Sequence, residues 1–259
     1  MFSPSNRAGE PVRQFAFFPL TGILVLAAAA LPAARAQSGQ FVIAFNGHNV
    51  GMATCDFAAT PHGYNSTSVV RVTMQGLDYA LSKNERLTSG NELRHVVLSA
   101  VINNEAVTVT GAPDAAQVIL NFSADGRSTV ASLPAHPGAV FMPDFDPGAL
   151  ETLLALAVER NNRGLWAIVP KKTGAQAGSK TGSVEPIQLA TYADQQGTLD
   201  GKPIVVHHLV ATIAGASTDL FSGPENRLLQ AELPQEGFAL VRKGFVLKPP
   251  ARAAAPPAE

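Results

Sequence analysis

Charged residues and cysteine are both scarce in this sequence. Charged side chains make up 15% of the 259 residues, well below the roughly 25% of an average soluble protein. The 19 Lys and Arg side chains are balanced by 20 Asp and Glu. The basic excess typical of nucleic-acid binders is therefore absent, and we expect no nucleic-acid partner. The single cysteine excludes an internal disulfide and a zinc site of several thiolates.

The apolar residues are also unevenly spread, because many of them lie in an uncharged run at 14–34. Two arginines precede this run, and Ala34-Arg35-Ala36 follows it in the pattern of a signal-peptidase site. We therefore predict a secretory signal peptide at residues 1–36. The alternative is a permanent anchor, since about 20 apolar residues can span a bilayer. Pro19 and Gly22 interrupt the run and favour cleavage.

No later apolar run is long enough to cross a bilayer, so we expect a periplasmic or secreted protein with no transmembrane segment after cleavage. Residues 37–247 are predicted to form one β-rich domain. Residues 248–259 form a Pro/Ala-rich tail that is predicted to be disordered. A second flexible connection is predicted at residues 171–182, where Gly, Ser and Lys dominate.

Short turns separate the strand-like segments of the predicted domain. Asn46-Gly47, Asp125-Gly126 and Asp200-Gly201 each lie between two such segments, and Asn-Gly and Asp-Gly pairs provide the positive φ that tight hairpins need. Asn103-Asn104 also connects two such segments. Because hairpin connections join antiparallel strands, we predict a largely antiparallel sheet.

Only one segment has a convincing helical pattern. Asp146 is a candidate N-cap and Pro147 suits the first helical position, while Gly164 is a candidate for the residue just past the helix end. The residues expected to form a single apolar stripe are Leu150, Leu153, Leu154, Ala157 and Val158.

One helix of this length cannot cover a sheet of nine or more strands. The uncovered part must close into a barrel, fold over itself or leave a groove. The segment 202–213 has apolar residues on both strand faces, which predicts cover by the helix on one side and by a cavity or second sheet on the other. The predicted fold class is mainly β (α+β): a curved antiparallel sheet or half-barrel around one central amphipathic helix.

The sequence contains no recognisable catalytic or metal-binding motif. No G-x-S-x-G pentapeptide occurs, and the loop ending in Lys180-Thr181 has the wrong spacing for a phosphate loop. His207 and His208 are adjacent on a strand and so point to opposite faces. We predict no metal site and no cofactor. Cys55 is expected to be a buried core residue.

The segment GQFVIAFNGHNVGMATCDF resembles the first hairpin of exported bacterial proteins with a LolA-like half-barrel. The later run GTLDGKPIVVHHLVATIAGASTDLFSGPENRLLQAELPQEGFALVRKG resembles their closing half. The resemblance implies a curved antiparallel sheet with an apolar concavity, which in better-known relatives carries acyl chains or a lipidated partner. It places the ligand-binding residues at Leu150, Leu154, Val158, Trp166 and Leu209.

These observations favour an exported, non-catalytic protein that binds an apolar ligand, a lipid or an envelope component. The first alternative is a hydrolase or metal-dependent enzyme with a site built from scattered residues such as Glu92, His95, Asp144 and His207. The second is a scaffold that binds another envelope protein through its sheet edge.

Overall fold

The computed structural model describes residues 37–170 and 182–248. The predicted signal peptide, the predicted tail beyond residue 248 and nearly all of the predicted connection at 171–182 lie outside these residues. The described residues belong to one compact unit. No helix among the described residues is long and apolar enough to cross a membrane.

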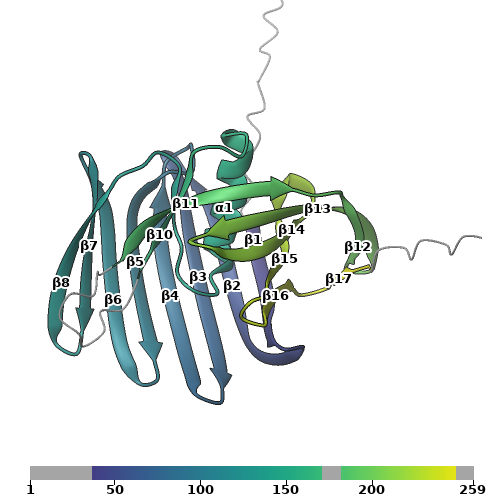
Figure 1. The fold of residues 1–259 in the computed structure, drawn as a ribbon, viewed down its shortest axis with the longest axis horizontal. Coiled ribbons are helices and arrows are strands. Elements are labelled where there is room, and N and C mark those ends of the chain that lie inside the picture. The colour runs from purple at the N-terminus through teal and green to yellow at the C-terminus, as the bar shows by residue number, and fades with distance from the viewer. Residues whose placement is uncertain (1–36, 171–181, 249–259) are drawn as a thin grey trace, which may run out of the picture. The chain divides into compact units, whose positions relative to one another are not determined.

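The first half of the described chain is a series of eight long strands joined by hairpin turns (Figure 1). Each strand pairs antiparallel with the next along the chain. The strands are β1 (Gln37–Phe45), β2 (His48–Thr60), β3 (Gly63–Met74), β4 (Leu77–Leu87), β5 (Leu93–Ile102), β6 (Glu105–Asp114), β7 (Gln117–Ala124) and β8 (Arg127–Pro134).

The second half extends the same sheet from the other side of β1. Its elements are β9 (Ala139–Phe141), α1 (Pro147–Glu159), β10 (Leu165–Val169), β11 (Ser183–Thr191), β12 (Gln195–Leu199), β13 (Lys202–Ile213), β14 (Ala216–Ser222), the 3-10 helix η1 (Pro224–Asn226), β15 (Leu228–Leu233), β16 (Phe238–Arg242) and β17 (Phe245–Leu247). From β1 the pairing runs through β16, β15, β14, β13, β11 and β10 to β9. Only the β9–β10 pair is parallel among the described pairs.

The sheet curves but does not close. Its two terminal strands, β8 and β9, are not paired with each other in the described part of the chain. Instead β9 contacts β5, and β11 contacts β8, so the end of the sheet folds back over its first half. Helix α1 lies inside this curve and packs on β2, β3, β9, β10 and β15. The predicted fold class, a mainly β chain with a curved antiparallel sheet around one helix, is therefore confirmed.

The predicted hairpin turns are confirmed by backbone geometry. Asn46 and Gly47 have φ of 48° and 80°, and Asp125 and Gly126 have φ of 51° and 71°. Asp200-Gly201 and Asn103-Asn104 are likewise in the left-handed region. These residue types tolerate positive φ at low cost, so the local sequence determines where each strand turns back.

The helix begins as predicted and ends earlier than predicted. Asp146 is the N-cap, and its Oδ1 accepts a hydrogen bond of 2.9 Å from the amide of Gly148. The helix ends at Glu159 rather than just before Gly164, because Asn161 and Asn162 adopt φ of 51° and 59° and end the helical conformation.

The predicted single apolar stripe is only partly correct. Leu150, Leu153, Leu154 and Ala157 are buried, but Val158 is 61% exposed. Leu156, which lies outside the stripe, has no exposed surface. The reason is that the curved sheet surrounds α1, so that most of the helix is buried, while its last turn reaches solvent.

Strand β13 is covered on both faces, as its sequence predicts. Leu209 and Ala211 face the main core, which also contains α1. On the other face, Val206 packs with Phe221, Leu229 and Phe245 in a second small core. This second cover is a small sheet layer in which β12 pairs with both β13 and β17. The beginning of the strand is less covered, since Val205 is 47% exposed.

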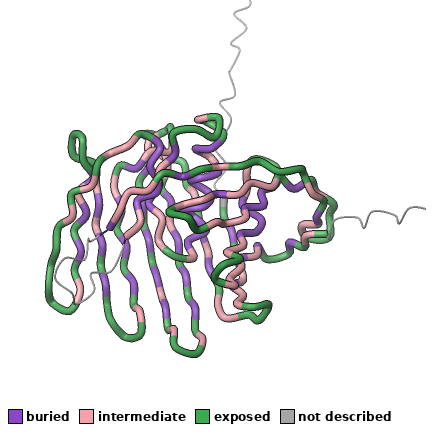
Figure 2. Tube along the Cα trace, in the orientation of Figure 1, coloured by how far each residue is buried: buried purple, intermediate pink, exposed green. Residues whose placement is uncertain are grey.

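Buried and exposed residues alternate along the long strands β3 to β7 (Figure 2). This alternation places one side chain of every two on the inner face of the sheet. Cys55 lies on the inner face of β2 and is 2% exposed, which confirms its prediction as a core residue.

Candidate functional site

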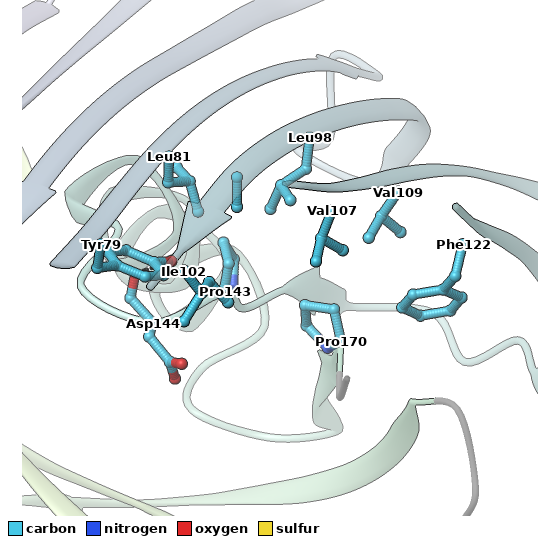
Figure 3. Close-up of a pocket in the computed structure, with 11 residues that line it drawn as sticks. Tyr79, Leu81, Leu98, Ile102, Val107, Val109, Phe122, Pro143, Asp144 and Pro170 are labelled. Atoms are coloured by element: carbon cyan, nitrogen blue, oxygen red, sulfur yellow. Dashed lines mark hydrogen bonds between the residues drawn. The ribbon is translucent and has the colours of Figure 1, made fainter. Parts of the chain in front are cut away.

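The inner face of β4 to β7 contains an apolar groove (Figure 3). It holds about 450 Å³ of space free of protein atoms, including the part open to solvent. The lining residues are Tyr79, Leu81, Leu98, Ala100, Ile102, Val107, Val109, Phe122, Pro143, Asp144 and Pro170. We call this feature the inner-face groove.

Strand register brings these side chains together. Leu81 lies opposite Ala100, which lies opposite Val107 on the next strand. Leu98, Val109 and Phe122 form a second such row. Residues directly opposite each other in neighbouring antiparallel strands share one face. Each row crosses three strands, and together the two rows span the four strands β4 to β7, which at a spacing of about 4.8 Å corresponds to about 14 Å.

The groove is roofed by chain segments rather than by the helix. Pro143 follows β9 and Pro170 follows β10, and both face the strand side chains in Figure 3. Helix α1 instead packs on β2, β3 and β15. Among the described residues, the cover over this apolar face includes Pro143 and Pro170, next to the strands β9 and β11 that contact β5 and β8.

One end of the groove is polar. The Tyr79 hydroxyl donates a hydrogen bond of 3.3 Å to the backbone oxygen of Asp144, and the Phe145 ring packs edge-on against the Tyr79 ring. Asp144 is exposed as a residue, but partial desolvation of its carboxyl raises the pKa, and the negative charge of Glu236 raises it further. Within the described residues this carboxyl has no cationic partner, so it would favour a ligand group that donates a hydrogen bond.

A second cavity is lined by the segment 142–146. It shares Pro143 and Asp144 with the inner-face groove and holds about 1100 Å³ of space, including open solvent. Most of its lining is apolar, from Met142, Phe145, Leu150, Val169, Ile213, Leu233 and Leu240. Asp144 therefore borders two apolar cavities.

A third cavity lies at the end of α1 and contains a histidine held by a carboxylate. His207 Nδ1 is 2.9 Å from Asp194 Oδ1. Ser222 lies directly opposite His207 in the β13–β14 ladder, and all three residues line a space of about 770 Å³. Ser222 also lies at a β-bulge between β14 and β15, a feature that changes the direction of a side chain.

The structure brings three of the five residues predicted to bind a ligand to one cavity and separates the other two from it. Leu150 lines the second cavity, while Leu154, Val158 and Leu209 line the third. Trp166 lines none of these three cavities; its ring instead stacks on His136 with a centroid distance of 3.8 Å. None of the five lines the inner-face groove. The inward positions of β5 to β7 could have been found from their alternating pattern, but the sequence does not show which of them the helix leaves uncovered.

The residues proposed for a scattered catalytic site also lie apart. His207 lines the third cavity and Asp144 the other two, whereas Glu92 is paired with Arg160. His95 is on β5 and lines none of the three cavities. Over residues 37–170 and 182–248, no group of three or more His, Cys, Asp and Glu could hold a metal ion.

Comparison with protein-family models, curated proteins and solved structures finds no match to this chain. The resemblance to LolA-like proteins therefore stays a prediction. The proposed function is therefore based on the cavities and on the side chains that line them.

Proposed function

We propose that this protein is an exported carrier or receptor that binds an apolar ligand, such as an acyl chain, in the inner-face groove. One observation supports this most strongly. The apolar side chains of β4 to β7 are buried members of the main core, and on their inner side they line a partly open space of about 450 Å³, which includes open solvent. Concave sites lined mainly by apolar side chains with a few polar groups are typical of small-molecule binding. Export is part of the proposal and depends on the predicted signal peptide.

The groove would bind such a ligand with moderate affinity. Burying about 250 Å² of acyl surface at about 25 cal/mol per Å² contributes about 6 kcal/mol. Ordering the ligand and restricting its motion offsets part of this gain. We therefore expect dissociation constants in the micromolar range or weaker.

The Asp144 carboxyl would select the polar end of the ligand. A carboxylate head group placed beside Asp144 and Glu236 would be repelled. An amine or hydroxyl head group could instead donate a hydrogen bond to the carboxyl. We expect single-chain alcohols or amines to bind more tightly than the fatty acid of the same chain length.

A pair of adjacent substitutions tests the location of the site. Ala100 lines the groove, whereas Val101, the next residue on β5, is 42% exposed. Ala100→Phe would fill the groove, and Val101→Phe would add the same ring on the opposite face. Binding of a fluorescent long-chain amine, measured by titration, should weaken at least about tenfold in Ala100→Phe, the effect of losing about 1.4 kcal/mol of ligand contact.

The Val101→Phe variant should bind like the wild type, because its ring is outside the groove. Circular dichroism and a thermal melt would show that both variants are folded. Unchanged affinity in a folded Ala100→Phe variant would show that the ligand does not occupy the groove. Equal loss in both variants would contradict the assignment to the inner face.

A second function is favoured by the third cavity. We propose that Asp194, His207 and Ser222 could cleave an acyl ester. Asp194 holds His207 through Nδ1 and leaves Nε2 to accept the Ser222 hydroxyl proton. Ser222 Oγ would attack the ester carbonyl, the alcohol would leave with that proton, and water would release the acid. Ser222 is 1% exposed and is not hydrogen-bonded to His207 in the described structure, so substrate entry requires the cavity to widen.

Hydrolysis of p-nitrophenyl esters of increasing chain length tests this second function. The wild type should be faster than Ser222→Ala, and a fluorophosphonate probe should label the wild type alone. A rate in Ser222→Ala equal to that of the wild type would remove Ser222 as the nucleophile. The outcome is independent of binding in the inner-face groove, which shares no lining residue with the third cavity.

A further inference from the structure

Three ionisable side chains meet in the core between the sheet and the start of α1. Lys83 and Glu85 point inward from β4, and Asp146 caps the helix; all three side chains have no exposed surface. Lys83 Nζ is 2.6 Å from Asp146 Oδ2 and 3.0 Å from Glu85 Oε2. Each charged group must lose its hydration to occupy this position, at a cost of several kcal/mol.

Simple charge pairing does not account for this cluster. Two carboxylates face one ammonium group, so one negative charge is in excess in the fully ionised form. On the neighbouring strand, the hydroxyls of Ser66 and Ser68 are buried and have no hydrogen-bond partner among the described residues. Glu85 Oε1 is likewise without a partner there. Apolar residues of similar size would stabilise the same helix–sheet contact as well or better.

Lys83 and Asp146 form a close ion pair. Asp146 Oδ2 lies 2.6 Å from the Lys83 nitrogen, which is within the distance of a charge-assisted hydrogen bond. The other oxygen, Oδ1, is held by the amide N–H of Gly148 at 2.9 Å. The carboxyl group is therefore fixed by the helix N-terminus, with the amine beside it.

We propose that Lys83 and Asp146 join in an intramolecular isopeptide bond, with Glu85 as the group that transfers protons. The Lys83 nitrogen attacks Cγ of Asp146, the new N–C bond forms, and the Cγ–Oδ2 bond breaks. Of the three ammonium protons, one stays on the amide nitrogen and two leave with Oδ2 as water. Glu85 accepts a proton from the nitrogen and passes one to the departing oxygen, so it ends as it began.

The surroundings of the cluster favour each part of this reaction. Exclusion of water brings the neutral amine and carboxylic acid closer in energy to the ion pair. Burial raises the pKa of Glu85, which makes a carboxylic acid available to protonate the leaving oxygen. The Gly148 amide and the positive end of the helix dipole stabilise the negative charge that develops on Oδ1. Holding the two reactants in contact removes the entropic cost of bringing them together.

Burial is the largest single influence on Lys83 and lowers its pKa, but the two carboxylate neighbours together outweigh burial and raise the pKa above its ordinary value. The resting cluster thus keeps the ammonium form, and the reaction starts only when a proton moves to a carboxylate. This makes the reaction a slow, single event after folding. A covalent link would tie the first turn of α1 to β4 and close the chain between residues 83 and 146. The one cysteine of the chain cannot make such a link by itself.

Mass spectrometry of the purified full chain tests the proposal. The wild type should be lighter than its sequence by one water molecule, and a digest of the denatured protein should yield one branched peptide joining Lys83 to Asp146. Lys83→Met and Glu85→Gln should both show the full mass. Lys202→Met, which changes an exposed lysine on β13, is the control and should retain the loss of water.

The wild-type protein gives the decisive result, so that the outcome does not depend on the folding of the core variants. A folded wild type with separate, unlinked peptides for Lys83 and Asp146 would overturn the proposal. Loss of water at another pair of residues would overturn it as well. A branched peptide that persists in Glu85→Gln would remove the proton-transfer role of Glu85.

Discussion

Glu151 is expected to make the protein less stable as pH rises towards neutrality. It lies on α1, is 6% exposed, and its Oε1 is 2.8 Å from Arg242 Nη2. Burial raises the pKa of this carboxyl from 4.5 to about 7, although Arg242, the backbone of Leu228 and Arg227 lower it. Between these two pKa values the folded protein therefore holds one more proton than the unfolded chain.

The sign and size of the effect follow from this difference in bound protons. Stability falls with pH wherever the folded state binds more protons than the unfolded state. The contribution of Glu151 is complete below about pH 4.5 and is lost as pH rises through about 7. At about 1.4 kcal/mol per pH unit, the difference between a pKa of 4.5 and one of about 7 corresponds to a contribution of about 3.5 kcal/mol.

Urea unfolding of the wild type and of Glu151→Gln, at several pH values between 5 and 8, would measure this contribution. The glutamine amide is neutral at every pH, so the variant lacks the effect of Glu151. Glu85 and Asp144 also have raised pKa values, but they titrate in both proteins and cancel in the difference. The stability of the wild type relative to the variant should fall by up to about 3 kcal/mol across this range. A difference that stays constant or rises with pH would refute the reasoning, because Arg242 would then keep Glu151 ionised throughout.

Three further substitutions give distinct outcomes. Arg242→Met removes the partner of Glu151 and the donor to the Leu228 oxygen. This variant should lower the free energy of unfolding at pH 8 by about 3 kcal/mol or more. A loss below about 1 kcal/mol would be inconsistent with a buried ion pair. Gly51→Ala places a Cβ 2.1 Å from the backbone oxygen of Arg71, and urea unfolding should show a free energy of unfolding lower by about 1–3 kcal/mol. In the control Gly90→Ala, no neighbour lies closer than 3.8 Å to the new Cβ, and the free energy of unfolding should fall much less. Asp144→Asn should abolish the preference of the groove for amine over carboxylate ligands in competition titrations, and an unchanged preference would mean that Asp144 does not contact the head group.

Local signals in the sequence were sufficient for much of the fold. The turn at Asn46-Gly47 and the cap at Asp146 depend on a few neighbouring residues, and both were predicted. Burial of both faces of β13 was predictable because its apolar residues occupy both odd and even positions, which point to opposite faces of the strand. The helix ends earlier than predicted because Asn161 and Asn162 already adopt the left-handed conformation upstream of Gly164, which adopts it as well.

The sites depend on long-range packing, which local patterns do not reveal. Val158 follows the helical spacing of a buried residue, but it lies where the sheet no longer surrounds the helix. Lys83 and Glu85 did have a signal, since they are in phase with the inward residues Leu81 and Leu87 on β4. A polar pair at inward positions indicates a buried cluster. Its partner, Asp146, could be identified only from the structure.

Photoaffinity labelling tests the central proposal most directly. A long-chain amine carrying a diazirine near its methyl end would be bound to the full-length protein, irradiated and mapped by peptide mass spectrometry. The account predicts labels on inner-face residues such as Leu98, Val109 and Phe122, with loss of labelling when unlabelled amine competes. Competable labels confined to the exposed face, for example at Val69 or Val97, or an absence of competable labelling, would contradict it.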